Sequence, residues 1–91
     1  MIRQVLVVEN RLGLHARAAA KLVHLASRFQ SDVHLAREGR AEAIDSKSIL
    51  GILMLAAGRG TRLVVSISGP DEAEAGEAIL QLFAGRFGED I

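Results

Sequence analysis

The sequence predicts an α+β fold in which a four-stranded antiparallel sheet is covered on one face by three helices. The first observation is the order of the predicted elements: strand, helix, strand, strand, helix, strand, helix. One antiparallel sheet with its helices on a single face accommodates this order. The second is composition, because 49% of the 91 residues are hydrophobic and only one is proline, too apolar for a disordered chain. A chain of this length forms one core, so residues 1–91 are expected to be a single domain.

The first predicted strand and the first predicted helix lie on either side of a turn. Residues 2–8 are rich in valine and leucine and precede the turn residues Asn10 and Gly13, which predicts a strand. Residues 16–29 repeat apolar side chains at helical spacing, which predicts an amphipathic helix. The apolar positions of this helix are Ala18, Leu22, Leu25 and Phe29.

A strand hairpin is predicted next. Residues 32–37 place apolar side chains on one side of a strand. The Glu38-Gly39 pair then predicts a turn into a second short strand over residues 40–44.

The next two elements are a short helix and a strand. The apolar run of residues 49–55 follows residues that favour helix N-caps and precedes glycines that can end a helix. The N-cap candidates are Asp45, Ser46 and Ser48, and the sequence does not choose among them. Residues 62–68 alternate apolar and polar side chains over most of their length, which is the clearest strand pattern in the chain.

The last predicted element is a helix that begins around Pro70. Proline suits the first position of a helix, and the acids Asp71 and Glu72 complement its dipole. The helix is expected to end at Gly85 or Gly88. Its buried positions are expected to be Ala75, Ile79 and Leu82.

Charge and cysteine content narrow the classes of function. The chain has 11 basic and 11 acidic residues, and its only aromatic residues are three phenylalanines, which argues against a nucleic-acid partner. The absence of cysteine excludes disulfides and thiolate chemistry. No apolar run approaches the roughly 18 residues of a membrane span. We therefore expect a cytoplasmic protein with no membrane partner.

One histidine stands where a loop becomes a helix. In the run Gly13-Leu14-His15-Ala16-Arg17, the histidine directly precedes the first predicted helix. The unpaired N–H groups and the positive dipole end of a helix start suit a phosphate dianion, and Arg17 adds a cation. These residues predict a phosphohistidine site at His15. The simpler alternative is a polar residue that flanks a surface helix.

A second motif accompanies the first, because residues 47–55 read KSILGILML. Together, in this register, the two motifs resemble the HPr family of histidine-containing phosphocarriers of the phosphoenolpyruvate-dependent phosphotransferase system. The resemblance covers essentially the whole chain and implies the family's open-faced sandwich, with the element order βαββαβα. One departure is Ala18, which stands where the family usually has proline. Proline presets the backbone of a first helical turn, so we expect this loop to be less pre-organised.

The resemblance implies a relay of phosphoryl groups. His15 would accept a phosphoryl group from the phosphoenolpyruvate-charged donor, enzyme I, and pass it to acceptors of the enzyme IIA type. Arg17 would stabilise the phosphate. Such a monomeric carrier is not an enzyme, and positioning plus charge neutralisation suffice for transfer without metal or cofactor. His24 and His34 are expected to be surface residues that share no ligand with His15.

Ser48 can act in two ways. A serine before a helix usually caps it by accepting a hydrogen bond from a backbone N–H group. The matching serine of Gram-positive HPr proteins is phosphorylated by a dedicated HPr kinase/phosphorylase, which would add about two negative charges at this helix end. The resemblance thus implies regulatory phosphorylation at Ser48, whereas the residues alone indicate a cap.

The apolar run after Ser48 is more apolar than one short helix can bury against a sheet. By resemblance, Ile49, Leu50 and Leu53 form the apolar part of the surface that binds the donor and the acceptors. The basic residues expected beside this surface, in addition to Arg17, are Lys21 and Arg28. The alternative is an ordinary core helix.

Two other functions compete with the relay. One is an HPr-like regulatory interaction module of a nitrogen-type or incomplete phosphotransferase system that is not linked to sugar uptake. The other is a small hydrolase with His15 as its base, but no nucleophile and orienting acid stand at matched spacing, and no Gly-x-Ser-x-Gly motif occurs.

Overall fold

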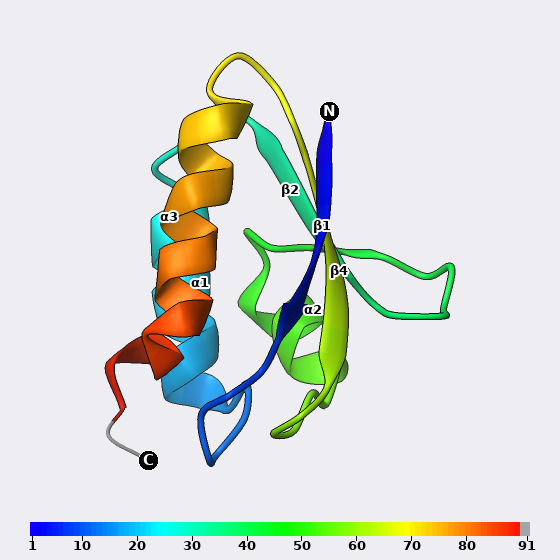
Figure 1. Ribbon diagram of the computed structural model, residues 1–91, viewed down its shortest axis with the longest axis vertical. Helices are drawn as coiled ribbons and strands as arrows, with labels where there is room; N and C mark the ends of the chain where they lie inside the picture. Colours follow the sequence, from blue (N-terminus) through cyan, green and yellow to red (C-terminus); the bar gives the residue numbers. More distant parts are fainter. Residues whose placement is uncertain (90–91) are drawn as a thin grey trace.

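A computed structural model describes residues 1–89 and has the predicted α+β architecture. The four strands form one antiparallel sheet in the order β1-β4-β2-β3. Helix α1 contacts both α2 and α3, so the three helices form one layer, which lies on one side of the sheet (Figure 1). The elements are β1 (Ile2–Val7), α1 (Ala16–Ala26), β2 (Asp32–Arg37), β3 (Ile44–Asp45), α2 (Ile49–Met54), β4 (Arg62–Ser68), α3 (Glu72–Ala84) and a 3₁₀ turn, η1 (Arg86–Gly88).

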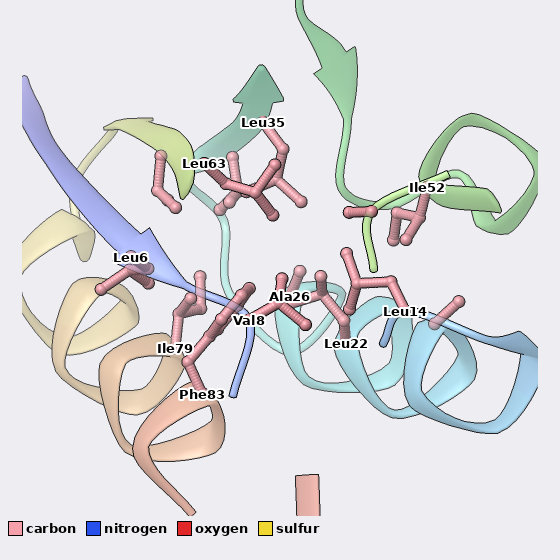
Figure 2. Close-up of a cluster of buried hydrophobic side chains, with 14 of the residues drawn as sticks. Leu6, Val8, Leu14, Leu22, Ala26, Leu35, Ile52, Leu63, Ile79 and Phe83 are labelled. Carbon is pink, nitrogen blue, oxygen red and sulfur yellow. The ribbon is translucent and has the colours of Figure 1, made fainter. Parts of the chain in front are cut away.

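The core lies between the sheet and the helix layer. Strand β4 follows its predicted alternation, because the side chains of Leu63, Val65 and Ile67 are buried while their neighbours point to the open face. Figure 2 shows Leu63 and Leu35 pointing from the strands toward Leu22 of α1 and Ile79 of α3. Central strand β4 pairs with β1 and β2, which fixes the register of both neighbours.

The predicted strand over residues 40–44 is wrong in extent. Glu38 and Gly39 do form a turn, in which the N–H of Arg40 donates to the carbonyl of Arg37 at 3.0 Å and Gly39 has φ +88°. Residues 40–43 then have no strand structure and are exposed; β3 pairs with β2 only through Ile44 and Asp45. Alanine and glutamate are weak strand formers, and these side chains contact no apolar layer that would stabilise their pairing with β2.

Helix α1 ends three residues earlier than predicted. The N–H groups of Arg28 and Phe29 bond to the carbonyls three residues back, which tightens the chain into a turn after Ala26. Ala18 and Leu22 are buried as predicted, but Leu25 and Phe29 are only half-buried. The buried stripe is instead completed by small residues, Ala19 and Ala26, so the helix packs close to its neighbours.

Helix α3 differs from the prediction at its start and at one core position. It begins at Glu72 with Asp71 as the N-cap, so Pro70 precedes the helix and does not take its first position. Ala75 and Ile79 are buried, whereas Leu82 is half-buried and Phe83 takes its place in the core. Helices α2 and α3 and strand β1 end within one residue of the predicted ends. No helix within residues 1–89 is long and apolar enough to cross a membrane.

Candidate functional site

His15 is the N-cap of α1. Its backbone is extended (φ −73°, ψ 179°), and its carbonyl accepts the first intrahelical hydrogen bond, from the N–H of Ala19 at 2.8 Å. The ring nitrogen Nδ1 accepts a hydrogen bond from the N–H of Arg17 at 3.2 Å. Nδ1 therefore faces the N-terminus of the helix, where the N–H groups before Ala19 lack intrahelical partners.

The loop before His15 is held by backbone contacts. Buried Asn10 donates from Nδ2 to the carbonyl of Gly13 at 2.7 Å, and the N–H of Gly13 returns a bond to the Asn10 carbonyl at 3.1 Å. Gly13 has φ +70°, which glycine adopts without strain. The next residue, Leu14, is buried and bonds through its N–H to the carbonyl of Ala57 at 2.9 Å. These contacts fix the residue that precedes His15.

The C-terminal segment reaches the same site. Three consecutive residues with positive φ, Arg86, Phe87 and Gly88, reverse the chain after α3. Phe87 is buried, and its ring lies edge-on against that of Phe83, with centroids 4.9 Å apart. Lys21 donates to the Phe87 carbonyl at 2.6 Å, which ties the turn to α1.

This turn places Glu89 against the histidine ring. Its Oε2 lies 2.5 Å from Nε2 of His15, and its Oε1 accepts from Nδ2 of Asn10 at 3.1 Å. The hydrogen bonds from His15 and then Asn10 hold the pKa of the Glu89 carboxyl below its usual value, and the charge of Lys21 contributes. Sequence reasoning missed Glu89, because no local pattern signals a contact between residues 74 positions apart.

The site opens to solvent through one hollow. Arg17 and Lys21 both line it beside His15, as predicted for Arg17, so two cations and a helix N-terminus face one space. Such a hollow suits a phosphate group, and the half-buried ring of His15 supplies a nitrogen that can attack phosphorus. The residues that line it are Leu12, His15, Ala16, Arg17, Lys21, Gly88 and Glu89.

His24 and His34 lie away from this hollow and are exposed. Within residues 1–89, no group of three or more histidine, aspartate or glutamate side chains is arranged to hold a metal ion.

The structure selects Ser48 among the three N-cap candidates of α2. Its Oγ accepts from the N–H of Gly51 at 3.2 Å. Asp45 instead accepts from the N–H of Lys47 at 2.9 Å, and Ser46 is buried. Ser48 is exposed, so its hydroxyl is accessible at the surface.

Helix α2 exposes the apolar side chains that the sequence analysis assigned to a docking surface. The exposed fractions are 44% for Ile49, 66% for Leu50 and 38% for Leu53, whereas Ile52 is fully buried. Met54, at 75%, extends the same exposed apolar set. The prediction that part of this helix is exposed is thus confirmed; the partner that covers it stays a prediction.

Helix α2, which carries this surface, runs in the opposite direction to its neighbour α1. The start of α1 meets the end of α2 through the bond between Leu14 and Ala57. The end of α1 meets the start of α2, because Lys47 donates to the carbonyl of Phe29 at 3.0 Å. His15 and Ser48 therefore lie at opposite ends of the helix pair. Of the predicted basic neighbours, Lys21 joins the His15 hollow, while Arg28 follows the end of α1 on the Ser48 side.

Comparison with known proteins agrees with this arrangement. Residues 2–85 match the family described as the phosphorylation site of the HPr component of the phosphotransferase system. The chain is 51% identical to the phosphocarrier protein HPr of Cupriavidus necator over 98% of both chains, and 49% identical to that of Xylella fastidiosa over 99% of both. It superposes on the crystal structure of HPr-C-His from Thermoanaerobacter tengcongensis with a TM-score of 0.93 and 35% identity over 100% of both chains. For HPr from Bacillus anthracis the TM-score is 0.83, with 34% identity over 90% of this chain and 95% of that one. The chain therefore belongs to the HPr family of phosphocarrier proteins of the phosphotransferase system.

Proposed function

We propose that His15 carries the phosphoryl group and that its Nδ1 is the atom that accepts it. The observation that carries this proposal is the placement of Nδ1 at the N-terminus of α1, beside a hollow lined by Arg17 and Lys21. As the bond from Nδ1 to phosphorus forms, the bond from phosphorus to the donor breaks, and its electron pair returns to the donor. The helix N–H groups and Arg17 offset the phosphate charge during transfer.

The partners in this proposal are enzyme I as the donor and enzyme IIA-type proteins as the acceptors, met by a monomeric carrier in the cytoplasm. The docking surface consists of Ile49, Leu50 and Leu53, whose exposed side chains lie on the helix that packs beside α1. Exposed apolar side chains gathered on one element are typical of a protein interface. Lys21, in the hollow beside His15, and Arg28, just after the end of α1, add positive charge, which favours acidic partners. The protein itself carries the group between enzymes and is not an enzyme.

Incubation with enzyme I and labelled phosphoenolpyruvate tests the assignment of His15. We expect acid-labile phosphate on the wild type and none on His15→Ala. His24→Ala and His34→Ala are matched controls, because both residues are exposed histidines away from the hollow. Label that survives in His15→Ala and disappears in either control would overturn the assignment.

Arg17 is proposed to stabilise the phosphate in transit. Arg17→Ala keeps the backbone N–H that bonds to Nδ1 and removes the side chain beyond Cβ, including the guanidinium. One hydrogen bond to a charged group contributes about 1.5–3 kcal/mol, which corresponds to a rate loss of roughly 10- to 100-fold. Arg3→Ala, at an exposed position of β1, removes the same charge elsewhere and is expected to transfer at the wild-type rate. Equal rates for the two variants would contradict the role of Arg17.

Ser48 is proposed as a regulatory phosphorylation site for an HPr kinase/phosphorylase. A phosphate on Ser48 would lie at the N-terminus of α2 and place negative charge beside Ile49 and Leu50. Ser48→Asp mimics that charge, and Ser48→Asn is its control, because asparagine caps a helix as well as aspartate or serine without adding charge. We expect Ser48→Asp alone to weaken enzyme I binding, by about 1–3 kcal/mol. Equal affinities of the two variants, measured by calorimetry, would remove Ser48 from the docking surface.

A further inference from the structure

We infer that Glu89 is a positioning residue that fixes the His15 ring with its proton on Nε2 and leaves Nδ1 as the acceptor. This inference rests on the proposed role of His15 as the carrier of the phosphoryl group. Glu89 itself does not touch the phosphorus; it acts through the ring. The contact joins the start of α1 to the C-terminal turn, beyond residues 2–85 that the family match covers.

Two hydrogen bonds require the same tautomer of the ring. An ionised carboxylate only accepts hydrogen bonds, so Nε2 must donate its proton to Oε2 of Glu89. The N–H of Arg17 donates to Nδ1, which must therefore carry a lone pair. The neutral ring with its proton on Nε2 is the one form of His15 that satisfies both contacts. The lowered pKa of the Glu89 carboxyl agrees, because it favours the ionised form.

The carboxylate of Glu89 is held at several points. Its side chain is 12% exposed, and its second oxygen bonds to Asn10, a buried residue that also organises the loop before His15. Its backbone N–H donates to the carbonyl of Arg86 at 3.0 Å. The preceding turn is anchored by the buried Phe87, although φ +56° is unfavourable for phenylalanine. A backbone kept in this region by packing is typical of a functional site.

The position of Glu89 has a chemical consequence for transfer. When Nδ1 bonds to phosphorus, positive charge develops on the ring while the proton stays on Nε2. The charged groups beside the ring are Glu89, Arg17 and Lys21, and of these Glu89 faces the proton. Its negative charge stabilises the positive charge on the ring as the bond from Nδ1 to phosphorus forms. The carboxylate of a hydrolase catalytic triad orients and stabilises its histidine in the same way. In the return step the ring leaves phosphorus as a neutral imidazole, so no proton has to move in either direction.

Two substitutions separate the contact from the charge. Glu89→Ala removes the acceptor of the Nε2 proton and the charge together. Glu89→Gln keeps an accepting oxygen next to Nε2 and removes only the charge. Glu42→Gln is the matched control, because Glu42 is an exposed acid in the loop between β2 and β3. Thermal unfolding of all three shows whether the fold persists at the assay temperature.

The first readout is the nitrogen-bound proton of His15 in ¹⁵N-labelled protein, observed by NMR at pH 8. In the wild type and in Glu42→Gln we expect a downfield, slowly exchanging proton on Nε2. The signal is expected to persist in Glu89→Gln and to be lost through solvent exchange in Glu89→Ala. A protected proton on Nδ1 in the wild type, or an unchanged Nε2 signal in Glu89→Ala, would overturn the inference. A purely structural role of Glu89 predicts no such change of the ring proton in folded protein.

The second readout is the rate of transfer from enzyme I to His15. Loss of one charge-assisted contact is expected to slow both Glu89 variants roughly 10-fold, with Glu42→Gln unchanged. Wild-type rates in both Glu89 variants would refute the electrostatic step. If the wild type carries no phosphate on His15, the proposed function fails; if it does and the Glu89 variants match it in both readouts, only this inference fails.

Discussion

Replacement of Gly13 by alanine is expected to disturb the fold and the phosphorylation site together. Gly13 adopts φ +70°, and a Cβ built there would lie 2.6 Å from the carbonyl oxygen of Ala57 and 2.9 Å from the Cα of Gly58. Both are backbone atoms, which cannot rotate away as a flexible side chain would. The contact lies beside the hydrogen bond from Leu14 to Ala57, so relief of the clash must move the residue that precedes His15.

The magnitude follows from comparison with Gly39→Ala. Gly39 also has positive φ, +88°, but its Cβ would meet nothing within 4 Å. The left-handed backbone costs alanine about 1–2 kcal/mol at either position. Overpacking adds about 1–3 kcal/mol at Gly13 alone. Both variants gain the same stabilisation from a less flexible unfolded chain, so the difference between them isolates the clash.

Urea denaturation measures that difference, and a transfer assay at a temperature where both variants are folded measures its effect on His15. We expect Gly13→Ala to be less stable than Gly39→Ala by about 1–3 kcal/mol and to accept phosphate at least about 10-fold more slowly, since small displacements of a reacting group are costly. Equal stabilities would show that the loop does not approach Ala57 as closely as described. Equal transfer rates would show that this contact does not position His15.

Three further outcomes are expected. Ser48→Ala should lower the free energy of unfolding in urea by about 0.5–2 kcal/mol through loss of the helix cap, and Ser46→Ala by less; the reverse order would contradict the assignment of the cap. Ile52→Ala should cost about 2–5 kcal/mol in the same assay, and partly exposed Leu53→Ala clearly less, while equal losses would contradict the burial of Ile52. The hydrogen bond from the hydroxyl of Ser31, and then that from the N–H of Gln30, lower the pKa of Asp71 in the folded protein. The ionised carboxylate therefore stabilises the fold fully above the ordinary pKa of aspartate, and this contribution is lost as pH falls through the lower pKa of the folded state. The free energy of unfolding should therefore fall more steeply with decreasing pH in the wild type than in Asp71→Asn. Identical pH dependence in the two proteins would show that ionisation of Asp71 does not contribute to stability.

The parts of the fold that sequence reasoning predicted are those in which local pattern and packing agree. Strand β4 alternates along a buried face, and α3 carries acids in its first turn, which suit the positive end of a helix dipole. The predicted hairpin was wrong in the segment where local pattern and packing disagree. Gly39 signals a turn, but the residues after it have no neighbour to pack against, so pairing waits until Ile44 reaches Leu35. Turn residues indicate a change of direction, not the length of the strand that follows.

The candidate site was predictable only on one side of the histidine. His15, Arg17 and the helix start are consecutive in sequence, so their proximity follows from the helix alone. Glu89 reaches the ring through a turn in which Arg86 and Phe87 adopt positive φ. Those two residues ordinarily avoid this conformation, and burial of the Phe87 ring provides the compensating contact. Such a balance depends on the completed core and leaves no local pattern in the sequence.

The geometry separates binding from chemistry within one small domain. The exposed side chains of α2 depend on Ser48 and on the contacts of α2 with α1 and β3, none of which involves the C-terminal turn. The His15 ring depends on the loop at Asn10, the start of α1 and Glu89. Local opening of the C-terminal turn would therefore release the ring without altering the docking surface. Because opening of a terminal segment requires less free energy than global unfolding, such opening would change the reactivity of the carrier while the apolar side chains of its docking surface stayed in place.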